Sequence, residues 1–457
     1  MPPVALRRAP VACRAAPCAS STSLRDAVRR CRTQLRAHTT SAWRPISVLD
    51  EWVTKEARPI SLRQLMVFGR SLTESRLINS ANYVRTELPT RIAHRIRDMQ
   101  HLPYAVVKNT HISDVYNLYY NAFDSFRRIP EIRTLEENDE LCRIISENLK
   151  AHLTVIPKLA MGIIECSDLM EPRALDEFMN TILKSRISRR VIAEQHLALT
   201  TTFNSPYFSP GAKLSEADFI GEVFIRCVAQ DVITRCARAV QALARSTYGP
   251  SAPVPEIRVE GHLSASFPYI LNHFEYIVGE LLRNSVQAVV ERHLRLGTES
   301  QPPPIEVTIC ESSQHIIIRF SDQGGGVPKD ILPHLWSFVK GPQSQKLLEN
   351  LAKVPTMAAT MQELHIDDEL GRADLRTPSY DSPLSPPHPS SLSSLTKRPP
   401  NLQLGMGLPL SRVYAEYWAG SLELHSLAGY GVDTFLQISR LGNKNEQLAT
   451  RASMDAV

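Results

Sequence analysis

A chain of 457 residues has room for two domains of ordinary size. It contains no apolar run long enough to cross a membrane as a helix, so we expect no membrane span. The eight cysteines include no CxxC pair, which argues against a zinc site and favours reduced thiols. The net charge of +5 is concentrated at one end of the chain.

Residues 1–45 hold the whole basic excess. They contain nine arginines, no lysine and one acid, Asp26, which gives +8 here and leaves −3 for the remainder. This composition is typical of a mitochondrial transit peptide and predicts a location in the mitochondrial matrix. The alternative is a nucleic-acid-binding tail, but lysines and interleaved aromatic residues are missing, so we expect no nucleic-acid partner. No apolar segment follows the charges, which argues against a secretory signal.

Residues 46–245 are predicted to be mostly helical. Apolar residues recur at helical spacing, as at Ile92, Ile96 and Met99, and long stretches lack the Pro and Gly that interrupt helices. A four-helix bundle is the natural architecture for such a segment. The Pro-rich stretch 249–255 is the predicted junction with a second domain, 250–440, which we expect to hold a mixed sheet with helices on one face.

A helix is predicted over residues 272–293, with Glu280 and Asn284 on one side, one turn apart. The Asn284 amide oxygen suits Mg²⁺, and the Glu280 carboxylate suits the acceptance of a proton from an attacking hydroxyl. For an isolated pair of this kind, a solvated helix face is the better interpretation. Only the two sequence blocks described next favour a functional interpretation of this pair.

The second block ends a predicted strand. Residues 305–309 and 315–320 have the pattern of two strands joined by a tight turn, and Asp322 to Gly326 follow directly. Consecutive glycines let the backbone approach a ligand closely, and a carboxylate at this point can accept a hydrogen bond from the exocyclic amine of adenine. An ordinary glycine turn explains this block equally well.

The third block, Gly405 to Pro409, opens a predicted helix over 410–418, and helix starts bind phosphates. Two strands, 421–426 and 432–438, complete the domain, and 441–457 form a tail. The segment before the block, 341–402, is dense in Ser and Pro and is predicted to be largely disordered. The chain has neither a Walker A loop nor the motif set of the common protein kinases.

In this order the three blocks resemble the N, G1 and G2 boxes of the GHKL ATPase superfamily. Residues 407–417 resemble, more narrowly, the mitochondrial 2-oxoacid dehydrogenase kinases, which act on pyruvate dehydrogenase or on the branched-chain enzyme. Residues 87–95 match that family's first signature, and 185–190 followed by Gln195-His196 match its long-helix signature. The resemblance implies a four-helix bundle followed by a GHKL α/β sandwich, with 341–402 at the position of the ATP lid.

The resemblance also implies residue roles. Glu280 would be the general base on a substrate serine, Asn284 the Mg²⁺ ligand, and Asp322 the partner of the adenine amine. The nucleotide pocket would be formed by Arg283, Asn284, Gln287, Asp322, Gly324, Gly326, Leu404, Gly405, Met406, Gly407 and Leu408. A carboxylate-binding allosteric pocket for a 2-oxoacid would involve His152, Arg186 and Arg190, although an internal ion-pair network explains these residues without any ligand.

The implied activity is that of a protein serine/threonine kinase that uses ATP and Mg²⁺, with K⁺ as a further candidate ion. It would phosphorylate and inactivate the E1α subunit of a 2-oxoacid dehydrogenase, bind the lipoyl domain of the E2 core, and form a homodimer. Tyr276 resembles the branched-chain kinase at this position, whereas the breadth of the family favours pyruvate dehydrogenase, so both substrates remain open.

There are two further alternatives, and the first of them rests on departures from the family pattern. Gln403 replaces the first glycine of the G2 box and Val432 replaces a threonine near the last strand, so a catalytically weak scaffold bound to the dehydrogenase core is one alternative. A GHKL histidine kinase is the other, but the signatures at 87–95 and 185–196 argue against it.

Overall fold

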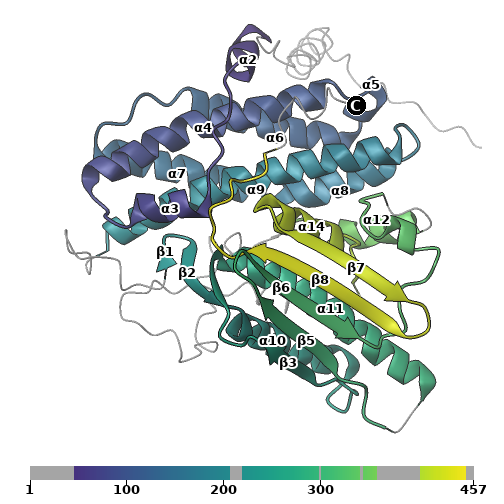
Figure 1. Cartoon of the computed structure of the whole chain (residues 1–457). Helices are drawn as coiled ribbons and strands as arrows, with labels where there is room; N and C mark the ends of the chain where they lie inside the picture. Colours follow the sequence, from purple (N-terminus) through teal and green to yellow (C-terminus); the bar gives the residue numbers. More distant parts are fainter. Residues whose placement is uncertain (1–45, 206–218, 298–299, 340–342, 358–401, 449–457) are drawn as a thin grey trace, which may run out of the picture. The chain divides into compact units, whose positions relative to one another are not determined.

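A computed structural model describes residues 46–205, 219–297, 300–339, 343–357 and 402–448 (Figure 1). The described residues from Trp52 to Leu448 belong to one compact unit. The predicted leader, most of the predicted lid segment and the end of the predicted tail lie outside the described residues.

The first part of the chain is helical, as predicted. Local signals set the helix starts: Ser61 with Gln64, and Thr134 with Glu137, form reciprocal capping boxes that satisfy backbone N–H groups. The helices are α2 (Ile46–Val53), α3 (Leu62–Gly69), α4 (Glu74–Gln100), α5 (Tyr104–Val107), α6 (Thr110–Arg127), α7 (Leu135–Ala151), the 3₁₀ turn η1 (His152–Thr154), α8 (Val155–Glu165) and α9 (Pro172–Phe203).

Helix α4 packs against α6 and α9, α6 also packs against α8, and α7 contacts α4, α6 and α9 (Figure 1). The apolar stripe predicted on α4 is buried, since Ile92, Ile96 and Met99 are at most 1% exposed. On α9, Ile182 and Ile187 are buried as well, at 0% and 2% exposed. The helical periodicity therefore identified the faces that form the core.

The second part of the chain is built on a mixed five-stranded sheet of order β3-β5-β6-β8-β7. Strand β3 pairs parallel with β5, and the other neighbours are antiparallel. The mixed sheet was predicted and is confirmed. Its strands are β3 (Ile257–Gly261), β5 (Ile305–Glu311), β6 (His315–Asp322), β7 (Ser421–Leu427) and β8 (Gly431–Ser439).

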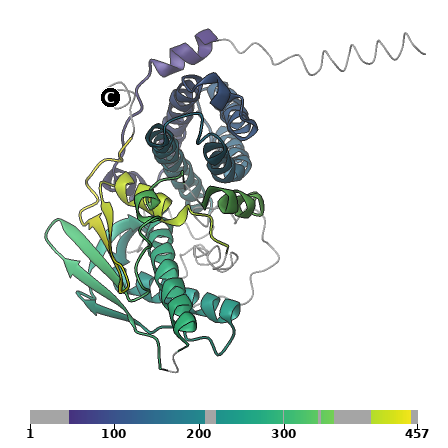
Figure 2. The same ribbon diagram turned by 90° about the vertical axis from the view of Figure 1, so that its right-hand side faces the viewer.

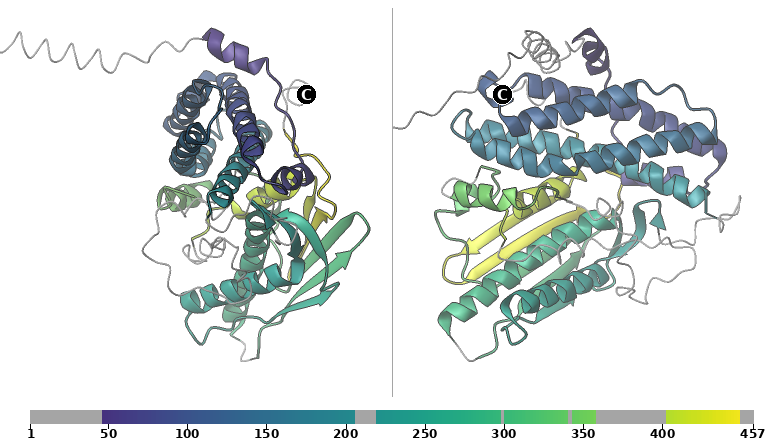
Figure 3. Two further views of the ribbon diagram at one scale, coloured as in Figure 1. Left: turned by 90° about the vertical axis from the view of Figure 1, so that its left-hand side faces the viewer. Right: turned by 180° about the vertical axis from the view of Figure 1, so that it is seen from behind.

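One face of this sheet is covered by helices. The helices of this part are α10 (Ala229–Tyr248), α11 (Leu271–Leu296), the 3₁₀ turn η3 (Leu332–His334), α12 (Ser344–Ala352) and α14 (Gly407–Tyr417). Figures 2 and 3 show α10 and α11 on the same side of the sheet. Residues alternate accordingly along β6, where Ile316 and Ile318 are fully buried while Ile317 is 37% exposed on the other face.

Residues 219–228 differ from the mostly helical stretch predicted for 46–245. They form β1 (Phe219–Ile220) and β2 (Val223–Val228), which pair with β4 (Ser266–Ile270) in a small antiparallel sheet. The turn between β1 and β2 is held by Gln195 of α9, which accepts from Glu222 N at 2.8 Å and donates to Ile220 O at 3.3 Å. The following helix α10 packs on α11 of the second part.

Part of the predicted lid segment is an ordered helix. Residues 344–352 form α12, which packs on α8 and buries Leu347 and Leu351. An apolar face at helical spacing explains this result, because the dense run of Ser and Pro begins only at Thr377, well after this helix. Asn350 of α12 donates to the Gln403 carbonyl at 2.8 Å, which ties this helix to the residues before α14.

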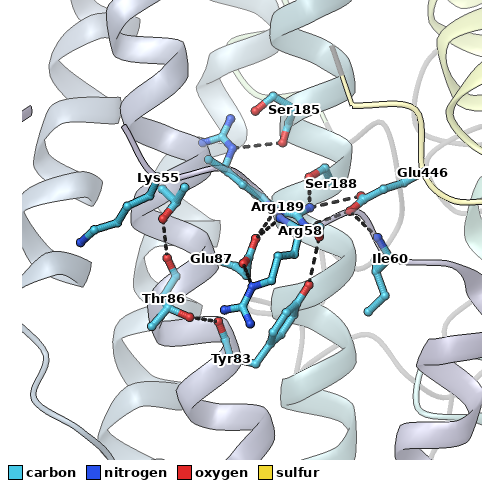
Figure 4. Close-up of polar contacts among 12 residues, drawn as sticks. Lys55, Arg58, Ile60, Tyr83, Thr86, Glu87, Ser185, Ser188, Arg189 and Glu446 are labelled. Atoms are coloured by element: carbon cyan, nitrogen blue, oxygen red, sulfur yellow. Dashed lines mark hydrogen bonds and ion pairs between the residues drawn. The ribbon is translucent and has the colours of Figure 1, made fainter. Parts of the chain in front are cut away.

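A buried charged cluster joins the two parts of the chain around Glu446 (Figure 4). The Glu446 side chain is fully buried and accepts from Ile60 N, from the Arg91 guanidinium and from the hydroxyl of Tyr417. Arg91 lies on α4 and Tyr417 on α14, so one carboxylate connects a helix of each part. Neighbouring backbone bonds add to this connection, from Glu446 N to Ile60 O and from Arg63 N to Gly442 O.

The same cluster explains both N-terminal signatures structurally. Glu87 pairs with Arg58 at 2.9 Å and with Arg91 at 3.2 Å, and Arg91 also donates to Ser188 of α9. Near the end of the second signature, His196 is fully buried, and its Nδ1 lies 3.1 Å from the Ser80 hydroxyl. These signature residues connect α4 and α9 with Arg58 and Glu446.

Replacing Glu446 with glutamine should lower the free energy of unfolding by about 3 kcal/mol, because Arg91 loses one of its two buried carboxylate partners and keeps its charge. Urea unfolding followed by circular dichroism measures the change. Glu423→Gln is the matched control: its side chain is 67% exposed, and its effect should stay within about 0.5 kcal/mol. Equal stability of Glu446→Gln and the parent would refute a stabilising role for this contact.

Candidate functional site

The first and third sequence blocks meet in the structure. Glu280 lies on the buried side of α11 and is 5% exposed, and its Oε1 lies 3.5 Å from Arg283 Nη1. Gly407, the first residue of α14, packs directly against this carboxylate, since a Cβ at Gly407 would lie 2.3 Å from Glu280 Oε2. Any side chain at position 407 would therefore displace Glu280.

Asn284 lies one turn further along α11 and is exposed. The spacing predicted that it would share a side of the helix with Glu280, and α11 extends unbroken through both. A buried carboxylate beside an exposed amide is the arrangement expected if one group handles a proton and the other a hydrated cation. The residues therefore fit a Mg²⁺ ion that is shared with a phosphate ligand.

The second block is fixed to α11 through Asp322, the last residue of β6. Asp322 accepts from the Ser285 hydroxyl at 2.9 Å and from Gly324 N at 2.8 Å. Burial raises the pKa of Asp322 above its ordinary value, and these two hydrogen bonds oppose that rise because they stabilise the charged form. Ser285 was not predicted as a site residue, although it follows Asn284 directly.

Gly324 is required by the close approach of this turn to α11. A Cβ at this position would lie 2.5 Å from the Ala288 side chain. Gly324 thus has a packing function at this turn, which the sequence did not indicate. Val432, a departure from the family pattern, is the partner of Asp322 in the β6–β8 register.

The start of α14 lies beside Glu280 and has no side-chain cap. The first amides of any helix lack acceptors within the helix, so this end can bind an anion. The remaining predicted residues fall in the same region: Arg283 and Gln287 are buried on α11, Gly326 follows β6, Leu404 and Met406 are buried before α14, and Gly405 and Leu408 are half-buried around its start.

The three residues of the predicted regulatory pocket also lie together. His152, Arg186 and Arg190 line a cavity of about 30 Å³ between α4, α7 and α9. Burial, and then the nearby Arg189, lower the pKa of His152 to about 3, so this imidazole is neutral at ordinary pH. A cavity of this size holds one or two water molecules.

Arg189 is a further cation of this pocket that was not predicted as a site residue. Its guanidinium lies 4.4 Å from the ring centre of Tyr119 and donates to the Ser185 carbonyl at 3.1 Å. Arg190, by contrast, is engaged by Glu194 on the same helix. The i,i+4 spacing of Arg186 and Arg190 indicated that pair, and nothing in the spacing indicated Arg189.

A larger cavity, which the sequence did not indicate, lies between α3, α4, α9 and residues 443–445. Its volume is about 600 Å³, and Leu65, Val84 and Ile192 contribute apolar walls. Val67 and Phe68 of α3, which also line it, are 56% and 41% exposed. The cavity is therefore apolar inside and accessible at one side.

Two classes of feature are missing from the part of the chain that the structure describes. None of its helices is long and apolar enough to cross a membrane. It also has no group of three or more His, Cys, Asp or Glu side chains arranged to hold a metal ion.

Comparison with known proteins gives the family. Residues 59–224 match the family model described as mitochondrial branched-chain alpha-ketoacid dehydrogenase kinase. The chain is 34% identical over 427 residues to the mitochondrial pyruvate dehydrogenase (acetyl-transferring) kinase 2 of Saccharomyces cerevisiae, with 88% of this chain and 85% of the relative covered. It is 28% identical to the mitochondrial pyruvate dehydrogenase (acetyl-transferring) kinase of Arabidopsis thaliana, with 88% and 96% covered.

A human relative gives the same result at lower identity. The match to the mitochondrial pyruvate dehydrogenase (acetyl-transferring) kinase isozyme 4 of Homo sapiens is 25% identical and covers 85% of this chain and 82% of the relative. The helical first part, the mixed sheet and the near-complete coverage of these relatives agree with one another. The chain belongs to the mitochondrial 2-oxoacid dehydrogenase kinase family and is an ATP-using protein kinase.

Proposed function

We propose that this kinase transfers the γ-phosphate of ATP to a serine of the E1α subunit of a 2-oxoacid dehydrogenase in the mitochondrial matrix, and thereby inactivates that enzyme. The observation that supports this most directly is the contact between Glu280 and Gly407. It brings a carboxylate next to a helix start that can bind phosphate.

In the proposed mechanism, Glu280 accepts the proton of the substrate serine as its oxygen attacks the γ-phosphate. Asp322 accepts a hydrogen bond from the adenine amine, and the first amides of α14 bind phosphate oxygens. Asn284 would hold Mg²⁺, and the ion would neutralise charge on the phosphates. Catalysis then depends on positioning and charge, as in other phosphoryl transfers, and needs no phosphorylated histidine.

The identity of the dehydrogenase remains a choice between two. The matched family model is named for the branched-chain enzyme, whereas the full-length relatives above are named for pyruvate dehydrogenase. Tyr276, the residue that resembles the branched-chain kinase, is buried, and its ring centre lies 5.3 Å from that of Tyr414 on α14. Incubation with each purified E1 component, followed by mapping of phosphoserine, distinguishes the two.

Docking on the dehydrogenase core is proposed for the 600 Å³ cavity beside α3. A lipoyl group on its lysine is a long, mostly apolar arm, and this cavity offers apolar walls with Phe68 exposed at its side. Binding of the E2 lipoyl domain with and without its lipoyl group tests this. Equal affinity of the two forms would contradict the proposal.

Two further proposals concern the state of the chain in the cell. Residues 1–45 are proposed to be removed on import, which N-terminal sequencing of the matrix form checks.

A homodimer is proposed, and the uncovered face of the sheet, where Ile317 is exposed, is available for the contact. Sedimentation velocity at micromolar concentration would contradict it by showing only monomer.

For the activity itself, the test uses protein lacking residues 1–45, labelled ATP, Mg²⁺ and both E1 components. Glu280→Gln should lower turnover about 10²- to 10⁴-fold with ATP affinity nearly unchanged, because a general base acts in the chemical step. Asp322→Ala should instead weaken ATP binding, because the adenine amine loses its acceptor. Phosphoserine mapping and nucleotide titration measure the two effects.

Glu423→Gln, a change on the exposed surface of β7, is the control for both variants. A parent protein that binds ATP but labels neither E1α would contradict the proposed substrate. Full turnover in Glu280→Gln would contradict the role of the base.

We propose that the cavity at His152 binds the carboxylate of a 2-oxoacid, with Arg186 and Arg189 supplying positive charge. The cavity must enlarge to admit even a small 2-oxoacid. Arg186→Gln should weaken pyruvate or 4-methyl-2-oxopentanoate binding about 10- to 100-fold, because a charge-assisted hydrogen bond is lost. Titration calorimetry measures this, and Arg173→Gln, 80% exposed on the same helix, should have no effect. Equal affinities would favour a purely structural cluster.

A further inference from the structure

Arg292 lies two turns beyond Asn284 on α11, and its guanidinium is half-buried among backbone carbonyls. Nη1 donates to Gln323 O and to Tyr430 O, both at 2.7 Å, and Nη2 donates to Gly429 O at 2.8 Å. The first acceptor follows Asp322 directly, and the other two belong to the hairpin between β7 and β8. One side chain thus connects a helix, a turn and a hairpin.

The turn and the hairpin also bond to each other. Gly325 N donates to Tyr430 O at 3.0 Å, Gly429 N donates to Gly325 O at 2.8 Å, and Val327 N donates to the Ser426 hydroxyl at 2.7 Å. The Tyr430 carbonyl therefore accepts from both Gly325 and Arg292. Gly325 has a φ of +97°, which favours glycine, whereas a Cβ there would make only an ordinary contact of 3.5 Å with Arg292 Cδ.

Electrostatics explain why a guanidinium suits this place. Three carbonyl oxygens converge on a small region, and their partial negative charges repel one another unless a donor neutralises them. Arginine presents several N–H groups in a fixed planar fork, so it can satisfy all three at once. A lysine ammonium carries the charge but lacks the fork.

We propose that Arg292 is a positioning residue that sets the selectivity of the nucleotide site for adenine. It fixes the Gln323 carbonyl, and through it the direction in which the Asp322 carboxylate faces the base. Ser285 and Gly324 hold the carboxylate itself, whereas Arg292 holds the backbone turn that follows it. This inference rests on the proposed function, because it assigns Asp322 to the adenine amine.

The alternative is a purely structural role, in which Arg292 only stabilises the hairpin. The two ideas differ in one readout. A loss of stability alone weakens all nucleotides alike, whereas a misdirected Asp322 weakens only those that carry the exocyclic amine. Inosine triphosphate has an oxygen in place of that amine, so the ratio of ATP affinity to inosine triphosphate affinity reports on the carboxylate.

The experiment measures the dissociation constants of both nucleotides, with Mg²⁺, for the parent, Arg292→Met and Arg292→Lys. Arg295→Met is the matched control, because Arg295 is exposed on the same helix. Arg292→Met should reduce the preference for ATP about tenfold, the effect of roughly one lost charge-assisted hydrogen bond. Arg292→Lys should recover part of that preference.

The outcomes separate this inference from the proposed function. A parent that prefers ATP, with Arg292→Met and Arg292→Lys preferring it equally, overturns the role of Arg292 and leaves the kinase proposal intact. A parent that binds neither nucleotide overturns the assignment of the site and this inference with it. If Arg292→Met does not fold, Arg292→Lys decides: a ratio equal to that of the parent overturns the inference.

Discussion

The contact between Arg91 and Glu446 is the interaction on which the arrangement of this molecule depends. A charged pair with both side chains almost completely buried costs desolvation energy, and only dense pairing makes up for it. Here Glu87, Ser188, Tyr417 and Ile60 supply the additional bonds. Because these residues come from α4, α9, α14 and the segments around Ile60 and Glu446, the pair holds segments that a purely apolar contact would leave free to slide.

This cluster also gives a structural explanation for several residues of the family signatures. Residues 87–95 and 185–196 resemble the kinases strongly, yet Glu87, Arg91, Gln195 and His196 hold helices and turns rather than a substrate. The residues that we propose for the chemistry lie elsewhere, on α11, β6 and α14. The residues by which a family is identified can thus be residues that form internal contacts. The structure is needed to tell such residues from those of a functional site.

Much of the fold could be predicted because long elements have clear periodicity. The helix expected over 272–293 is α11, and the two strands expected before Asp322 are β5 and β6. Strand β1, at two residues, is too short for any period to show, and its partner β2 was missed with it. The contacts of Arg292 and Ser285 were not predictable, because a hydrogen bond donated to a backbone carbonyl, or to a residue on a distant strand, leaves no pattern in the sequence.

The order of the strands has a consequence for how the molecule is made. Strand β8 is the last to leave the ribosome, yet it lies inside the sheet, between β6 and β7. Until residues 431–439 are available, β6 has an open edge and β7 has no partner in the sheet. Pairing between such distant segments is slow, so the five-stranded sheet can close only after residues 431–439 have been made. The chain therefore stays incompletely folded for most of its synthesis. A polypeptide in this state can still pass through a narrow channel.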